Sequence, residues 1–127
     1  MEIIFAEGAP NAVGPFSHAT LSNGFVFCSG QVSINPINMQ LEGDDIEQQT
    51  LKVFANIKSV LQSKGLGLED VVKANVYLAD MSSFSRMNIV YAQQFGAHKP
   101  ARTTVAVAGL PLGAIVEIEC IAEYKQK

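Results

Sequence analysis

Two amphipathic helical segments constrain the fold of this chain more than any other feature of its sequence. The first is capped by Asp44 or Asp45 and stops at Gly65, and the second follows the turn at residues 80–83 and ends at Gly96. The apolar face of the first helix is formed by Ile46, Thr50, Val53, Phe54, Ile57, Val60 and Leu61. The apolar stripe of the second is formed by Phe84, Met87, Tyr91 and Phe95. Each helix must bury one face, so a second layer of structure has to cover both.

The remaining apolar segments have the composition of β-strands. They cover residues 1–6, 16–21, 25–32, 71–79, 100–107 and 116–122. Asn23-Gly24 favours a type I′ turn and therefore a hairpin between the second and third segments. Gly30 predicts a bulge or a close backbone approach. In the fourth segment, alternation places Val72, Ala74, Val76 and Leu78 on one side and Lys73, Asn75 and Tyr77 on the other.

The order of these elements is strands, helix, strand, helix and two strands. Two helices can cover only one face of a mixed sheet, so the order predicts a two-layer α+β fold. At 127 residues, 48% of them hydrophobic, the chain is expected to form one domain over residues 1–127. The other sheet face would stay uncovered, and a second copy of the chain is its natural cover.

The last two strand segments have glycine and proline between them and are predicted to form a hairpin. If their apolar rows share one face, Arg102 and Thr104 share the opposite face with Glu117 and Glu119. Arg102 and Glu117 then have two interpretations. They form a cross-strand ion pair, or Arg102 holds a small anion while Glu117 handles a proton or a water.

Composition argues against several classes of function. A net charge of −3 with nine scattered Lys and Arg residues argues against nucleic-acid binding. No apolar run is long enough to span a membrane, and no signal peptide opens the chain, so a cytoplasmic location is expected, with an organelle left open. His18 and His98 lack partners at metal-ligand spacing, so no metal site is expected. Cys28 and Cys120 are expected to be buried free thiols.

A series of motifs from residue 12 to residue 124 resembles the Rid (reactive intermediate deaminase) family, also called YjgF or L-PSP endoribonuclease-like. The motifs are GPFSHA at 14–19, SGQV at 29–32, QT at 49–50, NI at 56–57, VVK at 71–73, DM at 80–81, Phe84, Asn88, Tyr91, Phe95, PAR at 100–102, LP at 110–111, EIE at 117–119 and IA at 121–122. The resemblance implies a chorismate-mutase-like fold and a homotrimer with clefts between subunits. It also implies hydrolysis of 2-imino or enamine acids, such as 2-iminobutanoate and 2-iminopropanoate, to 2-keto acids and ammonia without a cofactor.

The same resemblance assigns roles to individual residues. It implies that Arg102 binds the substrate carboxylate and that Glu117 positions the attacking water. The expected substrate-binding residues are Phe16, Ser29, Gly30, Asn88, Arg102 and Thr104. From the residues alone, Phe16 could equally be a packing aromatic and Ser29 a plain strand serine.

Three positions depart from the commonest family pattern. Phe16 stands where tyrosine is usual, Thr104 where cysteine is common and His18 where glutamine is common. The first departure bears on substrate preference and rate rather than on the class of reaction. Two other functions stay open at this point: an endoribonuclease acting on single-stranded RNA, and a non-catalytic trimer that binds metabolites or acts like a chaperone.

Overall fold

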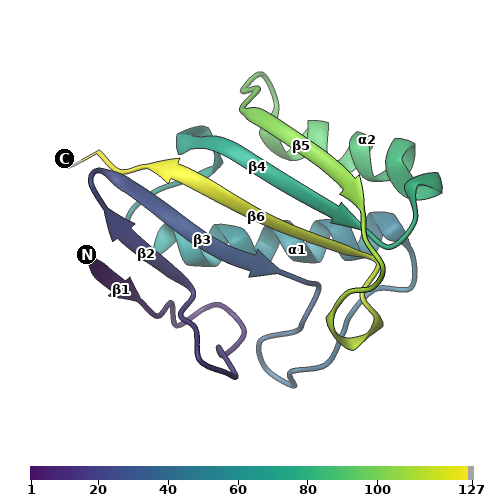
Figure 1. Ribbon diagram of the computed structural model, residues 1–127, viewed down its shortest axis with the longest axis horizontal. Coiled ribbons are helices and arrows are strands. Elements are labelled where there is room, and N and C mark those ends of the chain that lie inside the picture. The colour runs from purple at the N-terminus through teal and green to yellow at the C-terminus, as the bar shows by residue number, and fades with distance from the viewer. Residues whose placement is uncertain (126–127) are drawn as a thin grey trace.

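The computed structural model of the chain describes residues 1–125 and has a two-layer α+β architecture (Figure 1). The strands are β1 (Glu2–Ile4), β2 (Ala19–Ser22), β3 (Phe25–Gln31), β4 (Val71–Leu78), β5 (Ala101–Ala106) and β6 (Val116–Glu123). The two α-helices are α1 (Ile46–Gln62) and α2 (Phe84–Phe95). The strands form one sheet in the order β1-β2-β3-β6-β4-β5, and both helices lie against the same face of it. The predicted mixed sheet with two helices on one face is confirmed.

Both helices begin where the sequence predicts, and α2 ends at the predicted Gly96, whereas α1 ends at Gln62, a few residues before the predicted Gly65. The side chain of Asp45 accepts a hydrogen bond of 2.8 Å from the amide of Gln48, which caps the N-terminus of α1. After α1, Gly65 adopts a left-handed φ of 71°, and Gly96 does the same after α2 with a φ of 63°. The apolar stripes of the two helices pack on the sheet, where Phe54, Ile57, Leu61, Met87, Val76 and Ile118 are almost fully buried.

The β2–β3 hairpin and the bulge at Gly30 are also confirmed. Asn23 and Gly24 have positive φ values of 51° and 81°, as a type I′ turn requires. Between Cys28 and Gln31 the pairing of β3 with β6 shifts register, so Gly30 sits in a β-bulge. A Cβ atom at Gly30 would lie 2.5 Å from Oε2 of Glu117, which makes this a close approach as well.

The predicted hairpin between the last two strands is wrong. β4 lies between β5 and β6, pairing in parallel with β5 and antiparallel with β6. The chain leaves β4, forms α2 and returns as β5 beside β4, which is a β-α-β crossover and requires parallel strands. The glycine- and proline-containing segment that resembles a hairpin turn instead carries the chain past β4 to the space next to β3. The strand order depends on contacts between residues that are distant in sequence. The residues of the connecting segment alone therefore do not predict it.

The predicted common face of Arg102 and Glu117 is wrong for the same reason. Arg102 is paired with Ala74 and Thr104 with Val76, so both lie on the helix-covered face of the sheet. Glu117 is paired with Tyr77 and therefore lies on the open face, as does Glu119. The two residues with the strongest chemical interest thus project from opposite faces of one sheet.

Two smaller expectations need correction. Val72 is 40% exposed because a bulge between Val71 and Lys73 puts Val71 into the apolar row instead. Residues 16–18 precede β2 rather than belonging to it. There His18 is buried, accepting a 2.7 Å hydrogen bond from the amide of Ala6 at Nδ1 and contacting the carbonyl of Pro10 at 2.6 Å through Nε2. His18 therefore fixes the N-terminal loop to the sheet.

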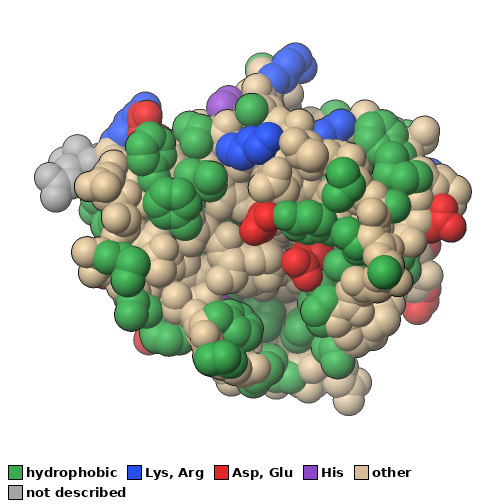
Figure 2. All heavy atoms as spheres, viewed as in Figure 1, with side chains coloured by type: hydrophobic (Ala, Val, Ile, Leu, Met, Phe, Trp, Pro, Cys, Tyr) green, Lys and Arg blue, Asp and Glu red, His purple; other side chains and the backbone are tan. Residues whose placement is uncertain are grey.

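The open face of the sheet is partly apolar and partly acidic (Figure 2). Its exposed hydrophobic side chains include Phe25, Phe27, Val72 and Val105. Acidic side chains lie in the middle of this face, where β6 contributes Glu117 and Glu119. Such an apolar area around a few fixed charges is typical of a surface that contacts another protein chain.

Candidate functional site

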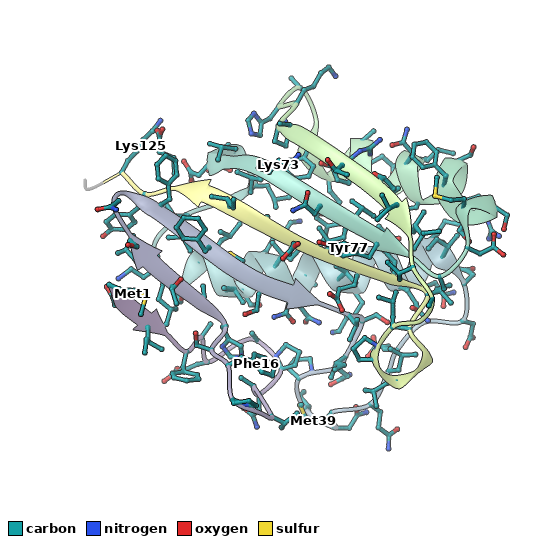
Figure 3. All side chains as sticks on the ribbon, in the orientation of Figure 1. Met1, Phe16, Met39, Lys73, Tyr77 and Lys125 are labelled. Atoms are coloured by element: carbon teal, nitrogen blue, oxygen red, sulfur yellow. The ribbon has the colours of Figure 1, made fainter. Side chains whose placement is uncertain are left out.

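Glu117 lies at a cleft of about 330 Å³ between the end of β3, the loop before β2 and the segment before β6. The residues that line it include Val13, Phe16, His18, Gly30, Val32, Ile34, Pro111, Leu112 and Glu117. Most of this lining is apolar, and Glu117 is its acidic group. Figure 3 shows Phe16 on the loop that precedes β2, and this cleft residue is 51% exposed. The cleft thus unites three of the predicted site residues, Phe16, Gly30 and Glu117.

The environment of Glu117 changes its acid–base chemistry. Burial raises the pKa of the Glu117 carboxyl, and the negative charge of Glu119 raises it further. Because Gly30 has no side chain, the carboxylate can lie directly over the bulged backbone of β3. A carboxylate held in this way, with increased proton affinity, is suited to orient a water molecule and to accept a proton from it.

Glu119 is held by two side chains of the neighbouring strand β4. The hydroxyl of Tyr77 donates a short hydrogen bond to Oε1 of Glu119, and Asn75 Nδ2 donates to the same oxygen at 3.3 Å. The hydrogen bond to Glu119, followed by burial, raises the pKa of Tyr77 to about 12. Sequence reasoning did not single out Tyr77 or Glu119 as functional, since the only signal was that they share a sheet face.

Arg102 lies at a different pocket, of about 200 Å³, between α2 and the start of β5. Its Nη1 donates a hydrogen bond of 2.6 Å to Oδ1 of Asn88. The guanidinium carbon is 4.6 Å from the ring centroid of Tyr91 and 5.5 Å from that of Phe84, so aromatic rings also hold the cation. Asn88 lies beside Arg102, so the structure brings these two predicted residues together. The guanidinium keeps further N–H groups with which to bind a carboxylate.

Two predicted residues have local structural roles. The hydroxyl of Ser29 donates a 2.7 Å hydrogen bond to the carbonyl of Ser17, which ties β3 to the loop before β2 next to the bulge. The hydroxyl oxygen of Thr104 is buried on the helix-covered face and has no hydrogen-bond partner among residues 1–125. Thr104 therefore belongs with Arg102 on that face, whereas Ser29 is next to Gly30 in the strand that supports Glu117.

Within one chain, these residues therefore lie in two separate clusters, which we name the acidic half-site and the cationic half-site. The acidic half-site holds Glu117 over Gly30, and the cationic half-site holds Arg102 beside Asn88. The ion pairs found within residues 1–125 do not join Arg102 to Glu117, so the simple interpretation of a structural salt bridge is excluded. In the same part of the chain, no three side chains of metal-binding type come close enough to hold an ion. None of its helices has the length and apolarity needed to cross a bilayer.

Comparison with known proteins gives a consistent result over nearly the whole chain. The family model described as endoribonuclease L-PSP matches residues 6–124. A RutC family protein of Pyrococcus horikoshii is 46% identical over 125 residues, which cover 98% of this chain and 98% of that protein. The chloroplastic Reactive Intermediate Deaminase A of Arabidopsis thaliana is 41% identical over 121 residues, covering 95% of this chain and 65% of that protein.

The solved structures agree with the sequence relatives. The crystal structure of TdcF from E. coli with bound serine has a TM-score of 0.92 and 33% sequence identity, and the match covers 98% of this chain and 100% of that chain. This likeness, together with the strand order, confirms the predicted chorismate-mutase-like fold. On the family match and these identities, the chain belongs to the L-PSP endoribonuclease-like family, which is also the Rid family.

Proposed function

We propose that this protein is a hydrolytic deaminase that converts 2-imino and enamine acids, such as 2-iminobutanoate and 2-iminopropanoate, to 2-keto acids and ammonia. The observation that carries the proposal is the Glu117 carboxyl, raised in pKa and placed over Gly30 at an apolar cleft. Two relatives point the same way. One is named as a reactive intermediate deaminase, and another binds serine, a small amino acid with the carboxylate that a 2-imino acid also carries.

The chemistry requires one water molecule and two proton movements. Glu117 orients the water and accepts its proton as the water oxygen bonds to C2 and the electron pair of the C=N bond moves to nitrogen. Glu117 then passes that proton to the nitrogen and is ionised again for the second step. In the second step the hydroxyl oxygen forms the C=O bond, its proton passes to nitrogen through Glu117, and the C2–N bond breaks to release ammonia. An imine carbon is already electrophilic and hydrolyses in water unaided, so positioning and a proton acceptor suffice.

The substrate carboxylate is bound by Arg102 in this proposal, and Arg102 must then come from a second copy of the chain. Arg102 and Glu117 project from opposite faces of one sheet, so each chain offers an acidic half-site and a cationic half-site. A homotrimer in which the open faces meet would cover the exposed Phe25, Phe27 and Val105. Because β5 is an edge strand of the sheet, its Arg102 would lie beside the neighbouring chain at the border of this contact, where it could join the neighbour's Glu117. The remaining predicted contacts, Phe16, Ser29, Gly30, Asn88 and Thr104, then line the same cleft from two chains.

The activity is tested by generating 2-iminobutanoate in place with threonine dehydratase and following 2-ketobutanoate formation. Wild-type protein should accelerate the reaction, and Arg102→Ala and Glu117→Gln should each lower kcat/KM by about a hundredfold or more. Matched controls are Arg86→Ala, where the exposed arginine pairs with Glu47, and Glu123→Gln on the exposed end of β6. Absence of acceleration by the wild type would overturn the deaminase.

Cleavage of single-stranded RNA at several salt concentrations, without imine hydrolysis, would favour the endoribonuclease that the family name describes.

Subunit mixing tests the shared site. Arg102→Ala and Glu117→Gln chains should each have little activity alone, but refolding them together in equal amounts should restore activity. With random mixing, half of the arginine half-sites and half of the glutamate half-sites are intact, so about one quarter of the sites regain both residues. No recovery in mixed oligomers, checked by mass measurement in solution, would mean that both residues act within one chain.

A further inference from the structure

On the open face, Tyr77 and Asn75 of β4 form a hydrogen-bonded cluster with Glu119 of β6. Both donors bind the same oxygen of Glu119, so they fix the orientation of its carboxylate. Tyr77 stands opposite Glu117 in the strand pairing, yet its hydroxyl reaches diagonally to Glu119. Tyr77 therefore draws the Glu119 carboxylate to a defined place beside Glu117 and leaves Glu117 itself unbound by β4.

The charge of Glu119 is not neutralised by an ion pair with any cation among residues 1–125. The cation nearest along β4, Lys73, donates to the hydroxyl of Thr103 at 3.1 Å instead. Figure 3 shows Lys73 and Tyr77 well apart along β4. Glu117 and Glu119 are two positions apart in β6, so their side chains project from the same face of the sheet. The rise of a strand places their Cα atoms about 7 Å apart.

We propose that Glu119, fixed by Tyr77 and Asn75, is a positioning residue whose negative charge keeps the Glu117 carboxyl able to accept and hold a proton during hydrolysis. The inference rests on the deaminase function proposed above. Glu119 neither touches the substrate nor exchanges a proton in this role. Glu119 acts through its negative charge from two residues further along the same strand. Because two like charges repel at this distance, the protonated form of Glu117 is favoured.

The other groups around Glu117 do not supply this effect. The titratable groups that face it are Glu119 on its own strand, Tyr77 on β4 and His18 across the cleft. Both ring nitrogens of His18 are used by the backbone of Ala6 and Pro10. On β3, the residue under the carboxylate is Gly30, which carries no charge. Among residues 1–125, Glu119 is therefore the charge that acts on Glu117.

The test compares Glu119→Gln with Glu119→Asp and with Glu123→Gln. Glu119→Gln keeps the size of the side chain and an oxygen for Tyr77 but removes the charge, whereas Glu119→Asp keeps the charge. Glu123→Gln removes a carboxylate from the exposed end of the same strand. Two readouts are needed: the pH profile of kcat/KM for 2-iminobutanoate, and the pH titration of the Glu117 side-chain carbon by NMR in protein labelled at glutamate.

We expect Glu119→Gln to move the acid limb of the kcat/KM profile and the NMR titration of Glu117 to lower pH together. At the wild-type optimum its kcat should fall roughly threefold to tenfold, because a less basic carboxylate accepts a proton less readily. Glu119→Asp should keep a pH profile of kcat/KM close to that of the wild type, because the charge remains. Glu123→Gln should leave both readouts unchanged.

An unchanged Glu117 titration in Glu119→Gln would overturn the inference, whatever the activity. A loss of activity with equal effects of Glu119→Gln and Glu119→Asp would also overturn it, because the role would then be one of shape. Failure of the wild type to hydrolyse the imine overturns the deaminase instead, and the NMR titration separates the two cases.

Discussion

The two half-sites of this protein are built in different ways. Arg102 is held by side chains of α2, through a hydrogen bond to Asn88 and a cation–π contact with the ring of Tyr91. Glu117 is placed by the shape of the backbone, because the bulge at Gly30 leaves room for its carboxylate. The cationic half-site is therefore sensitive to loss of a contact, whereas the acidic half-site is sensitive to loss of space. Substitutions in the two places should change different kinetic constants.

The largest effect is expected from filling the space under Glu117. In Gly30→Ala, the new Cβ would meet Oε2 of Glu117 at 2.5 Å, so the carboxylate has to move. Because the obstacle is the end of a flexible side chain, the fold should survive while kcat falls about a hundredfold. The matched control is Gly109→Ala, where a Cβ would meet no atom within 4 Å. A Gly30→Ala enzyme with normal kcat would show that the position of the carboxylate over the bulge is not needed.

A smaller effect is expected from loosening Arg102. In Asn88→Ala the guanidinium loses its 2.6 Å hydrogen bond but keeps its aromatic contacts. Substrate binding should weaken, with KM raised about tenfold and kcat within a factor of about two. Gln93→Ala, at an exposed position of the same helix, serves as the control. A fall in kcat at constant KM would contradict the distinction between the two half-sites.

The smallest effect is on stability and depends on pH. Burial raises the pKa of Glu117 in the folded protein, so the ionised carboxylate is disfavoured there. Its contribution to stability is present at low pH and is lost as pH rises through the folded pKa. Glu117→Gln should therefore gain roughly half a kcal/mol in free energy of unfolding over wild type at pH about 8, allowing for partial exposure to solvent.

The stability measurement is urea denaturation at constant protein concentration, repeated at pH about 4, where the advantage of Glu117→Gln should shrink. Glu123→Gln, which removes an exposed carboxylate of the same strand, is the comparison. If Glu117→Gln is less stable than wild type at pH about 8, then the carboxylate has a favourable partner, and its increased proton affinity has been misassigned.

Local features of the fold could be predicted from the sequence, because they depend on neighbouring residues. Asp45, Gly65 and Gly96 mark the helix ends, and Asn23-Gly24 marks the hairpin through its own backbone geometry. Strand order could not be predicted in this way. The segment between β5 and β6 contains the residues of a turn, yet the two strands it joins are separated by β4.

The candidate site shows the same division. Family resemblance indicated Arg102 and Glu117, but the alternation argument placed them on one face, which the parallel pairing of β5 with β4 excludes. Tyr77 and Glu119 are 42 positions apart, and their hydrogen bond left no local pattern in the sequence. Gly30 was recognisable as a bulge, but the side chain that occupies the space above it was not.

Placing Arg102 and Glu117 on opposite faces of one sheet has an evolutionary consequence under the proposed assembly. Each site would combine one half from each of two polypeptides, so duplicated genes could specialise separately. A copy that lost Glu117 would remain useful as the donor of Arg102 to a sister chain. Mixed assemblies would then tune the binding of the carboxylate and the hydrolytic step through different genes, which a site contained in one chain does not permit.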